Sequence, residues 1–198
     1  MVVVGVLALQ GDFLEHLEIL RELGVETRIV KKPEDLSTVN GLVIPGGEST
    51  TIGTLMAVKD LGDHLVKHLE KGLPVMGTCA GAILLANKVA DRVVGETNQY
   101  TLKVMNISIV RNIFGRQRNS FIADVEVENV GVVRAAFIRA PGIVEAWTPA
   151  KITGYVEHPT VGRVGAVAEQ DSILALTFHP EITGDKKIYQ YFVTKIKR

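Results

Sequence analysis

The single cysteine of this chain lies in a five-residue segment that could carry out nucleophilic chemistry. Residues 77–81 read Gly-Thr-Cys-Ala-Gly, follow an apolar run and precede a helical pattern. A nucleophile between two glycines at a strand-to-helix bend is held on a tight turn, and the N–H groups of the helix point toward the reacting centre. The same helix end favours a cysteine thiolate. The alternative is that Cys79 is a small buried apolar side chain, and the turn alone does not decide between the two.

A second candidate is the sequence His179-Pro180-Glu181, directly after the apolar run 173–178. Residues i and i+2 of an extended chain point to the same side, and Pro180 stiffens the segment between them. Glu181 could therefore hold the His179 ring and stabilise its imidazolium form, while the other ring nitrogen faces a nucleophile. Taken alone, the segment also fits a loop histidine followed by a surface glutamate.

The third candidate is residues 45–50, Pro-Gly-Gly-Glu-Ser-Thr, which also follow an apolar run. Gly46 and Gly47 let the backbone turn sharply near a ligand, and free N–H groups there could form an oxyanion hole. The segment is not a nucleotide P-loop because the lysine of that motif is missing. All three candidates follow predicted strands, and ligand sites of parallel sheets gather at the carboxyl ends of the strands. We therefore expect them to meet in one site.

Other polar residues carry weaker signals. His64 and His68 have the i, i+4 spacing of metal ligands, but no third ligand is evident, so we expect a solvated helix face and no metal. His16 and His158 have no evident partner. The basic segment 111–118 could bind a carboxylate through an arginine, or it could be an exposed turn.

These candidates need a sheet to position them, and the first half of the chain alternates between strands and helices. Strands are expected at residues 2–9, 25–30, 41–44 and 74–77. Asp12 is predicted to cap a helix that ends near Gly24 and carries Leu14, Leu17, Leu20 and Leu23. One or two helices are predicted between Ile52 and Gly72, and another from Ala82. This alternation favours a parallel sheet with helices on both faces.

The second half is richer in strands. They are expected at residues 103–110, 121–127, 132–138, 152–157, 164–169 and 173–178, some of them paired as hairpins. A closing helix is predicted at 182–196. The fold class is therefore α/β, with a parallel core and antiparallel additions, and we expect a single domain over residues 1–198.

Composition excludes several classes of protein. The 198 residues hold 22 Lys and Arg against 22 Asp and Glu, and this zero net charge argues against nucleic acid as the main ligand. No run of about 18 apolar residues exists, so no membrane span is expected. One cysteine cannot form an internal disulfide, and the start of the chain does not read as a signal peptide. We expect a protein of the reducing cytoplasm.

With residues 77–81 and 179–181 taken together, the chain resembles the class I, or triad, glutamine amidotransferase family. Within that family it is similar to the glutaminase subunits of pyridoxal 5′-phosphate synthase. That closer resemblance rests on residues 5–11, 45–51, 111–117 and 137–141, and the match spans nearly the whole chain. Residues 146–162 match nothing that we can anchor. The resemblance implies a three-layer α/β/α glutaminase fold.

The resemblance also implies roles for particular residues. Cys79 would be the nucleophile, and His179 and Glu181 would complete the triad. The residues implied to contact L-glutamine are Gly46, Gly47, Glu48, Arg111, Ile138 and Arg139. Backbone N–H groups of Gly47 and Ala80 would form the oxyanion hole. The implied partner is a (β/α)8 synthase subunit that uses the released ammonia, and we expect Gln10 and Gly11 to lie at its interface. No cofactor is implied for this chain.

Three other readings compete with this one. Intracellular cysteine hydrolases and stress proteins also place a cysteine on a strand-to-helix elbow, but there the histidine usually follows the cysteine closely. Here His179 lies 100 residues beyond Cys79 (179 − 79). A degenerate, non-catalytic glutaminase module would not need an intact Cys, His and Glu. A glutaminase subunit of another biosynthetic amidotransferase is the third alternative.

Overall fold

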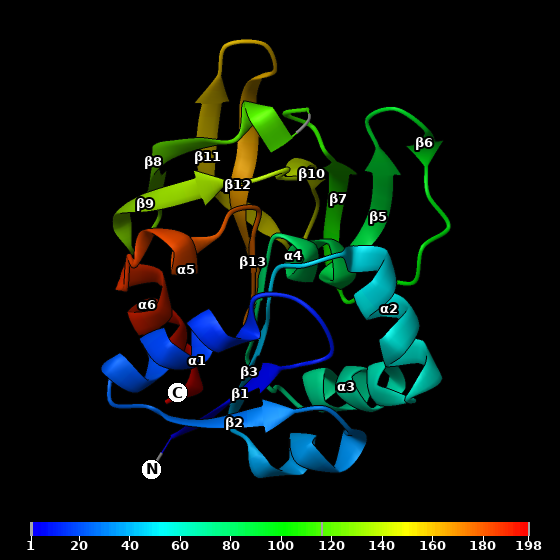
Figure 1. Ribbon diagram of the computed structural model, residues 1–198, viewed down its shortest axis with the longest axis vertical. Coiled ribbons are helices and arrows are strands. Elements are labelled where there is room, and N and C mark those ends of the chain that lie inside the picture. The colour runs from blue at the N-terminus through cyan, green and yellow to red at the C-terminus, as the bar shows by residue number, and fades with distance from the viewer. Residues whose placement is uncertain (1, 116, 198) are drawn as a thin grey trace.

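The computed structural model describes residues 2–115 and 117–197, and one twisted sheet runs through it (Figure 1). The lower half of the sheet is parallel. Its strands lie in the order β2 (Glu26–Val30), β1 (Val3–Leu7), β3 (Gly41–Ile44), β4 (Val75–Thr78) and β13 (Ile173–Leu176). The three central strands are almost wholly buried, as expected of parallel strands covered on both faces.

Helices cover both faces of these parallel strands. Helices α1 (Phe13–Glu22) and α6 (Lys187–Ile196) pack on one face, where Leu20 and Phe192 share a core with Val6. Helices α2 (Ser49–Val58), α3 (Leu61–Glu70) and α4 (Ala80–Leu85), with the 3-10 helix η1 (Pro33–Thr38), pack on the other face. Figure 1 shows α1 and α6 to the left of the strands and α2 and α3 to the right. None of the described helices is long and apolar enough to cross a membrane.

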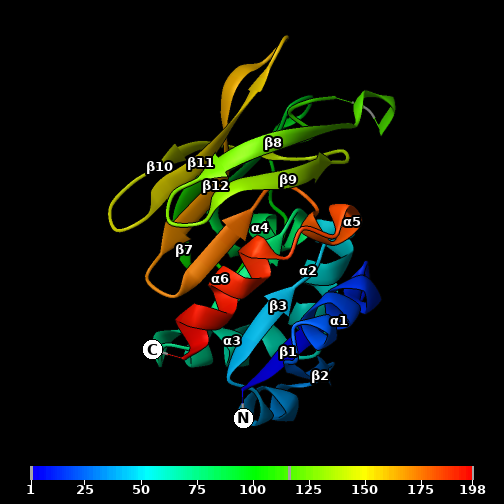
Figure 2. The same cartoon turned by 90° about the vertical axis from the view of Figure 1, so that its left-hand side faces the viewer.

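Antiparallel strands extend the sheet beyond β13. Strand β12 (Gly162–Gln170) pairs with β13 and is followed by β10 (Gly142–Ala146) and β7 (Met105–Arg111); β5 (Ala86–Asp91), parallel to β7, and β6 (Gly95–Glu96) complete this edge. Strand β11 (Lys151–His158) branches from β12 and leads to the hairpin of β8 (Phe121–Val127) and β9 (Gly131–Phe137). This hairpin lies above α6 (Figure 2). The predicted three-layer α/β/α fold, with a parallel core and antiparallel additions, is confirmed.

Several details differ from the predicted elements. The closing helix is two helices, α5 (Pro180–Thr183) and α6, because Gly184 turns the chain at φ 67°. Helix α4 begins at Ala80, not Ala82, and runs directly into β5. Strands β5, β6 and β10 were not predicted, because they are short or carry mixed polar residues without clear alternation. Leu14 is exposed, since the buried face of α1 is centred on His16, Leu17 and Leu20.

Candidate functional site

Cys79 occupies a strained turn at the carboxyl end of β4. Its backbone has φ 47° and ψ −101°, a conformation that side-chain-bearing residues rarely adopt. The turn is held by a hydrogen bond in which the Cys79 N–H donates to the Leu176 carbonyl of β13 at 2.8 Å. Helix α4 starts at the next residue, so the thiol stands at a strand-to-helix elbow, as the sequence predicts.

The two glycines of this segment allow the close packing that the turn requires. A Cβ atom on Gly77 would lie 2.6 Å from the carbonyl carbon of Gly81, and one on Gly81 would overlap the carbonyl oxygen of Ile44. Backbone atoms cannot yield as a flexible side chain can. Only glycine therefore lets α4 approach β3 and β4 this closely.

His179 and Glu181 form a short, buried hydrogen bond. The His179 Nδ1 atom lies 2.6 Å from Oε1 of Glu181, and the residues are only 6% and 7% exposed. His179 is extended, but Glu181 already lies in the first turn of α5, so the pair is not the fully extended segment that we predicted. The His179 N–H donates to the Ala136 carbonyl at 2.8 Å, which fixes its backbone to β9.

Electrostatics favour a protonated His179 beside the Glu181 carboxylate. Burial by itself lowers the pKa of His179, but hydrogen bonds and charges from Cys79 and Glu181 outweigh burial and raise the pKa to about 11. Burial raises the pKa of Glu181, but the hydrogen bond from His179 and the positive charge of His179 outweigh that effect and lower the pKa. The three side chains can therefore support a thiolate–imidazolium pair with a carboxylate behind it.

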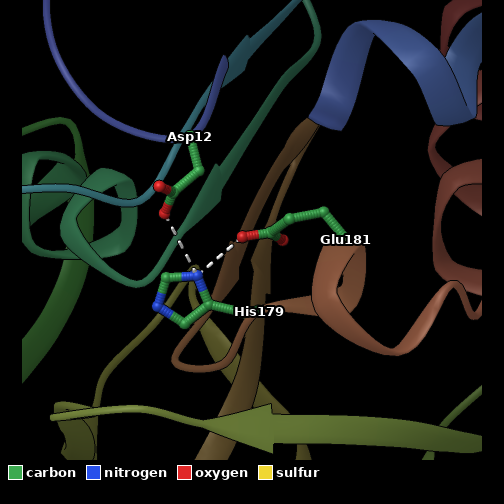
Figure 3. A group of neighbouring side chains, drawn as sticks. All are labelled: Asp12, His179 and Glu181. Carbon is green, nitrogen blue, oxygen red and sulfur yellow. Dashed lines mark hydrogen bonds and ion pairs between the residues drawn. The ribbon is translucent and has the colours of Figure 1, made fainter. Parts of the chain in front are cut away.

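Asp12 presents a second carboxylate to the same ring nitrogen. Figure 3 shows Asp12 and Glu181 facing Nδ1 of His179 from two directions. The Asp12 Oδ2 atom is 3.7 Å away, and this side chain is 44% exposed. Asp12 is the N-cap residue of α1, as predicted, but its side chain makes no capping hydrogen bond to the helix. Ligand atoms of Asp12, His179 and Glu181 lie within 4.8 Å of one another, a spacing compatible with a metal ion, but the hydrogen bond to Glu181 already occupies Nδ1 of His179.

A cavity of about 210 Å³ opens beside Cys79 and His179. Its size suits a metabolite smaller than a typical drug. The predicted residues on its wall are Gly47, Glu48, Cys79, Ala80, Arg111, Ile138, Arg139 and His179, and the residues not singled out as ligands are Asp12, Ser49, Ile83 and Asn112. The three candidate segments thus meet at one edge of the sheet.

The cavity wall carries charges of both signs. The Arg111 Nη2 atom is 3.8 Å from Oε1 of Glu48, and Arg111 also donates to Oε1 of Gln99 at 2.6 Å. Arg139 is exposed on the same wall, with a strained φ of 46°. An arginine beside a glutamate is the arrangement that would bind the carboxylate and ammonium groups of a free amino acid.

Some predicted site residues do not line the cavity. Glu181 lies behind His179, and Gly46 packs against the imidazole, where a Cβ atom would be 2.5 Å from Cε1. Gln10 and Gly11 support the turn after β3. The Gln10 Oε1 atom accepts the Glu48 N–H at 2.7 Å, and a Cβ atom on Gly11 would overlap the Gly46 carbonyl oxygen.

The remaining histidines divide into two groups. His64 and His68 direct Nδ1 to carbonyl groups one turn earlier in their own helix, and His158 contacts Thr160. His16 is instead completely buried behind Glu181, with Tyr189 as its partner. No local pattern reveals this contact because the two residues are 173 positions apart. Arg116 of the basic segment lies outside the described residues.

Comparisons with known proteins agree with the motifs. A pyridoxal 5′-phosphate synthase subunit PdxT from Hyperthermus butylicus is 54% identical over 198 residues, covering 100% of this chain and 98% of that protein. The PdxT subunit from Aeropyrum pernix is 48% identical over 202 residues, covering 98% of this chain and 99% of that protein. A crystal structure of a glutamine amidotransferase aligns with a TM-score of 0.88 at 41% identity, covering 98% of this chain and 99% of the other.

A more distant likeness concerns the fold alone. The structure of PurLQS from Thermotoga maritima aligns with a TM-score of 0.72 at 17% identity, covering 98% of each chain.

The model of the SNO glutamine amidotransferase family matches residues 6–198, which include every residue of the elbow, the cavity wall and the His179–Glu181 pair. Because that match spans nearly the whole sequence, the chain belongs to the SNO glutamine amidotransferase family.

Proposed function

We propose that this chain is the glutaminase subunit of a pyridoxal 5′-phosphate synthase, with Cys79, His179 and Glu181 as its catalytic triad. The observation that carries the proposal is the buried His179–Glu181 pair beside a cysteine on a strained elbow. Family membership and the names of the relatives support the glutaminase chemistry and the synthase. All the described strands join one sheet, which supports a single glutaminase domain.

The substrate that fits the cavity is L-glutamine. We assign its α-carboxylate to Arg111 or Arg139 and its ammonium group to Glu48, because opposite charges on the wall match the two ends of an amino acid. Ile138 and the backbone of Gly47 complete the binding surface. The side-chain carboxamide then points toward Cys79.

The reaction follows from the charge states of these residues. The Cys79 thiolate attacks the carboxamide carbon, and the backbone N–H groups of Gly47 and Ala80 stabilise the oxyanion. Protonated His179 gives its proton to the departing nitrogen, so the C–N bond breaks, ammonia leaves and a γ-glutamyl thioester remains. Neutral His179 then takes a proton from water as the water attacks the thioester. The C–S bond breaks, and glutamate and the Cys79 thiolate are released.

Ammonia is useful to a synthase only if it reaches the second active site before it escapes. We propose that a (β/α)8 synthase subunit docks where Gln10, Gly11 and the exposed face of α1 lie beside the cavity. Glu15→Lys and Glu18→Lys are expected to weaken the complex, whereas Glu70→Lys, on α3 across the sheet, is expected to leave it intact. Equal affinities of all three variants for the synthase subunit, measured by titration calorimetry, would contradict this docking face.

Because Cys79 must stay reduced, we place the complex in the cytoplasm.

The test of the proposed function is glutamate release from L-glutamine by wild type and Cys79→Ala, each with and without the synthase subunit. We expect release that requires Cys79 and rises when the synthase is added. Release by Cys79→Ala would refute the triad. Release that depends on Cys79 but ignores the synthase would point to an amidotransferase of another pathway, and no release in any mixture would favour a non-catalytic module.

A further inference from the structure

A buried polar cluster lies directly behind the proposed triad. His16 from α1 and Tyr189 from α6 are both 0% exposed, and the Tyr189 hydroxyl is 2.7 Å from Nδ1 of His16. On the other side of the imidazole, Nε2 lies 3.6 Å from Oε2 of Glu181 and 3.3 Å from the hydroxyl of Thr78. His16 does not line the cavity, so it cannot touch substrate there.

The hydrogen-bond needs of Glu181 show what this cluster provides. Oε1 of Glu181 holds His179, but the buried Oε2 atom has no hydrogen-bond partner among the described residues. A buried carboxylate oxygen without a donor is costly. The His16 Nε2 atom is placed to supply that donor, since it lies 3.6 Å from Oε2 and an N–H there can be shared between this oxygen and the Thr78 hydroxyl at 3.3 Å.

Tyr189 selects the tautomer of His16 that can donate. If the phenol O–H donates to Nδ1, the imidazole proton resides on Nε2 and faces Glu181. The other tautomer would direct the Nε2 lone pair at a carboxylate and leave the phenol proton without that acceptor. Burial lowers the pKa of His16 despite the raising effect of the Glu181 charge; the charge of His179 also lowers it, while Asp12 and Glu15 raise it. The ring is therefore a neutral donor.

We propose that His16, oriented by Tyr189, is a positioning residue that donates its Nε2–H to Glu181 and so fixes the carboxylate that holds His179. This inference rests on the proposed triad and extends it to a relay of five side chains, Cys79, His179, Glu181, His16 and Tyr189. Tyr189 is the last member of this chain of contacts, and its ring packs in the apolar core between α6 and the sheet.

The first test is Tyr189→Phe, with Tyr191→Phe as a matched control on the same helix. Each change removes one phenol hydroxyl and keeps the ring, but the Tyr191 hydroxyl donates to Glu169, away from the cavity. We expect Tyr189→Phe to lower kcat for glutamate release about 3- to 10-fold, the effect of one hydrogen bond, with KM for glutamine within about 2-fold of wild type. Tyr191→Phe should leave both constants unchanged. All measurements use the complex with the synthase subunit.

The second test is rescue at position 16. The amide of His16→Gln can still donate to Glu181, whereas His16→Leu cannot, so the Gln variant is expected to retain at least about 10-fold more kcat than the Leu variant. A low-field proton resonance from the His179–Glu181 hydrogen bond should shift in Tyr189→Phe and stay in place in Tyr191→Phe.

The outcomes separate this inference from the function on which it rests. If Tyr189→Phe matches Tyr191→Phe in kcat and in the low-field resonance, the relay is refuted while Cys79-dependent glutamate release still stands. If Cys79→Ala retains glutamate release, the triad and the relay both fail. If His16→Leu does not fold, the comparison of the two tyrosine variants still decides.

Discussion

Replacing Glu181 by glutamine tests the part of the site in which the charges are most tightly coupled. The change keeps the size of the side chain but removes the negative charge 2.6 Å from His179. It also offers an amide N–H to Nδ1, which would favour the wrong tautomer of the imidazole. We expect kcat to fall, because His179 must become an imidazolium during turnover.

The magnitude follows from the environment of the bond. Hydrogen bonds to charged groups are worth about 1.5–3 kcal/mol, and these two residues are nearly fully buried, so solvent screens little of that energy. At about 1.4 kcal/mol per tenfold, kcat should fall about 10- to 150-fold. The loss should be greatest in hydrolysis of the thioester. In that step Cys79 is acylated and uncharged, so Glu181 is the main group left to stabilise the imidazolium.

The assay is glutamate release under saturating glutamine, combined with intact-mass detection of a γ-glutamyl adduct on Cys79. Glu181→Gln should accumulate the adduct, with KM little changed. Glu169→Gln is the matched control, since Glu169 is equally buried and hydrogen-bonded but contacts Tyr191 and Lys195 instead of the site. An unchanged kcat in Glu181→Gln, or a rise in KM without a fall in kcat, would refute the orienting role of the carboxylate.

Three further outcomes are expected. Gly81→Ala would place a methyl group against the Ile44 carbonyl; overpacking of about 1–3 kcal/mol should lower Tm by about 2–12 °C in thermal melts and reduce activity, and a wild-type Tm would show that the turn can adjust. Arg111→Gln should raise KM for glutamine about 10- to 150-fold with little change in kcat, and an unchanged KM would remove Arg111 from substrate binding. The pKa of His179 is raised from 6.5 to about 11. Protonated His179 therefore stabilises the folded state fully below pH 6.5, and this stabilisation is lost as pH rises through about 11. The lowered pKa of Glu181 stabilises the fold above pH 4.5, an effect lost as pH falls through its folded value. Urea titrations should therefore show the largest excess stability of wild type over Glu181→Gln between about pH 4.5 and 6.5, and a constant excess from pH 5 to 11 would contradict the coupling.

The parts of the site that could be predicted are those written locally in the chain. Residues 77–81 predict a strand-to-helix elbow because two glycines flank a nucleophile after an apolar run. His179 precedes Glu181 by two residues, and this short spacing predicts their contact. The family that these motifs indicate is confirmed by the match over residues 6–198. The catalytic and binding roles of the individual residues remain predictions.

The parts that could not be predicted depend on contacts across the fold. Asp12 carries a helix-capping signal, but its carboxylate turns to His179, which lies 167 positions later (179 − 12). His16 appeared to lack a partner because Tyr189 comes from the last helix. Strand β10 is short and has a register shift in its pairing with β7, so its five residues show no clear alternation. In each case, packing between elements distant in the sequence decides the contact or the strand, and patterns in a single sequence carry no information on that packing.

The backbone link between Ala136 and His179 has a consequence for how the enzyme can change. Strand β9 holds the proposed base through Ala136, and the segment directly after the strand places Ile138 and Arg139 on the cavity wall. A shift of β9 that changed the binding of the amino acid would also move the His179 imidazole relative to the Cys79 thiol. On the proposed site, substrate preference and catalytic alignment are therefore coupled through β9, and we expect changes in specificity to be made most readily at Glu48 or Arg111, which lie on other elements.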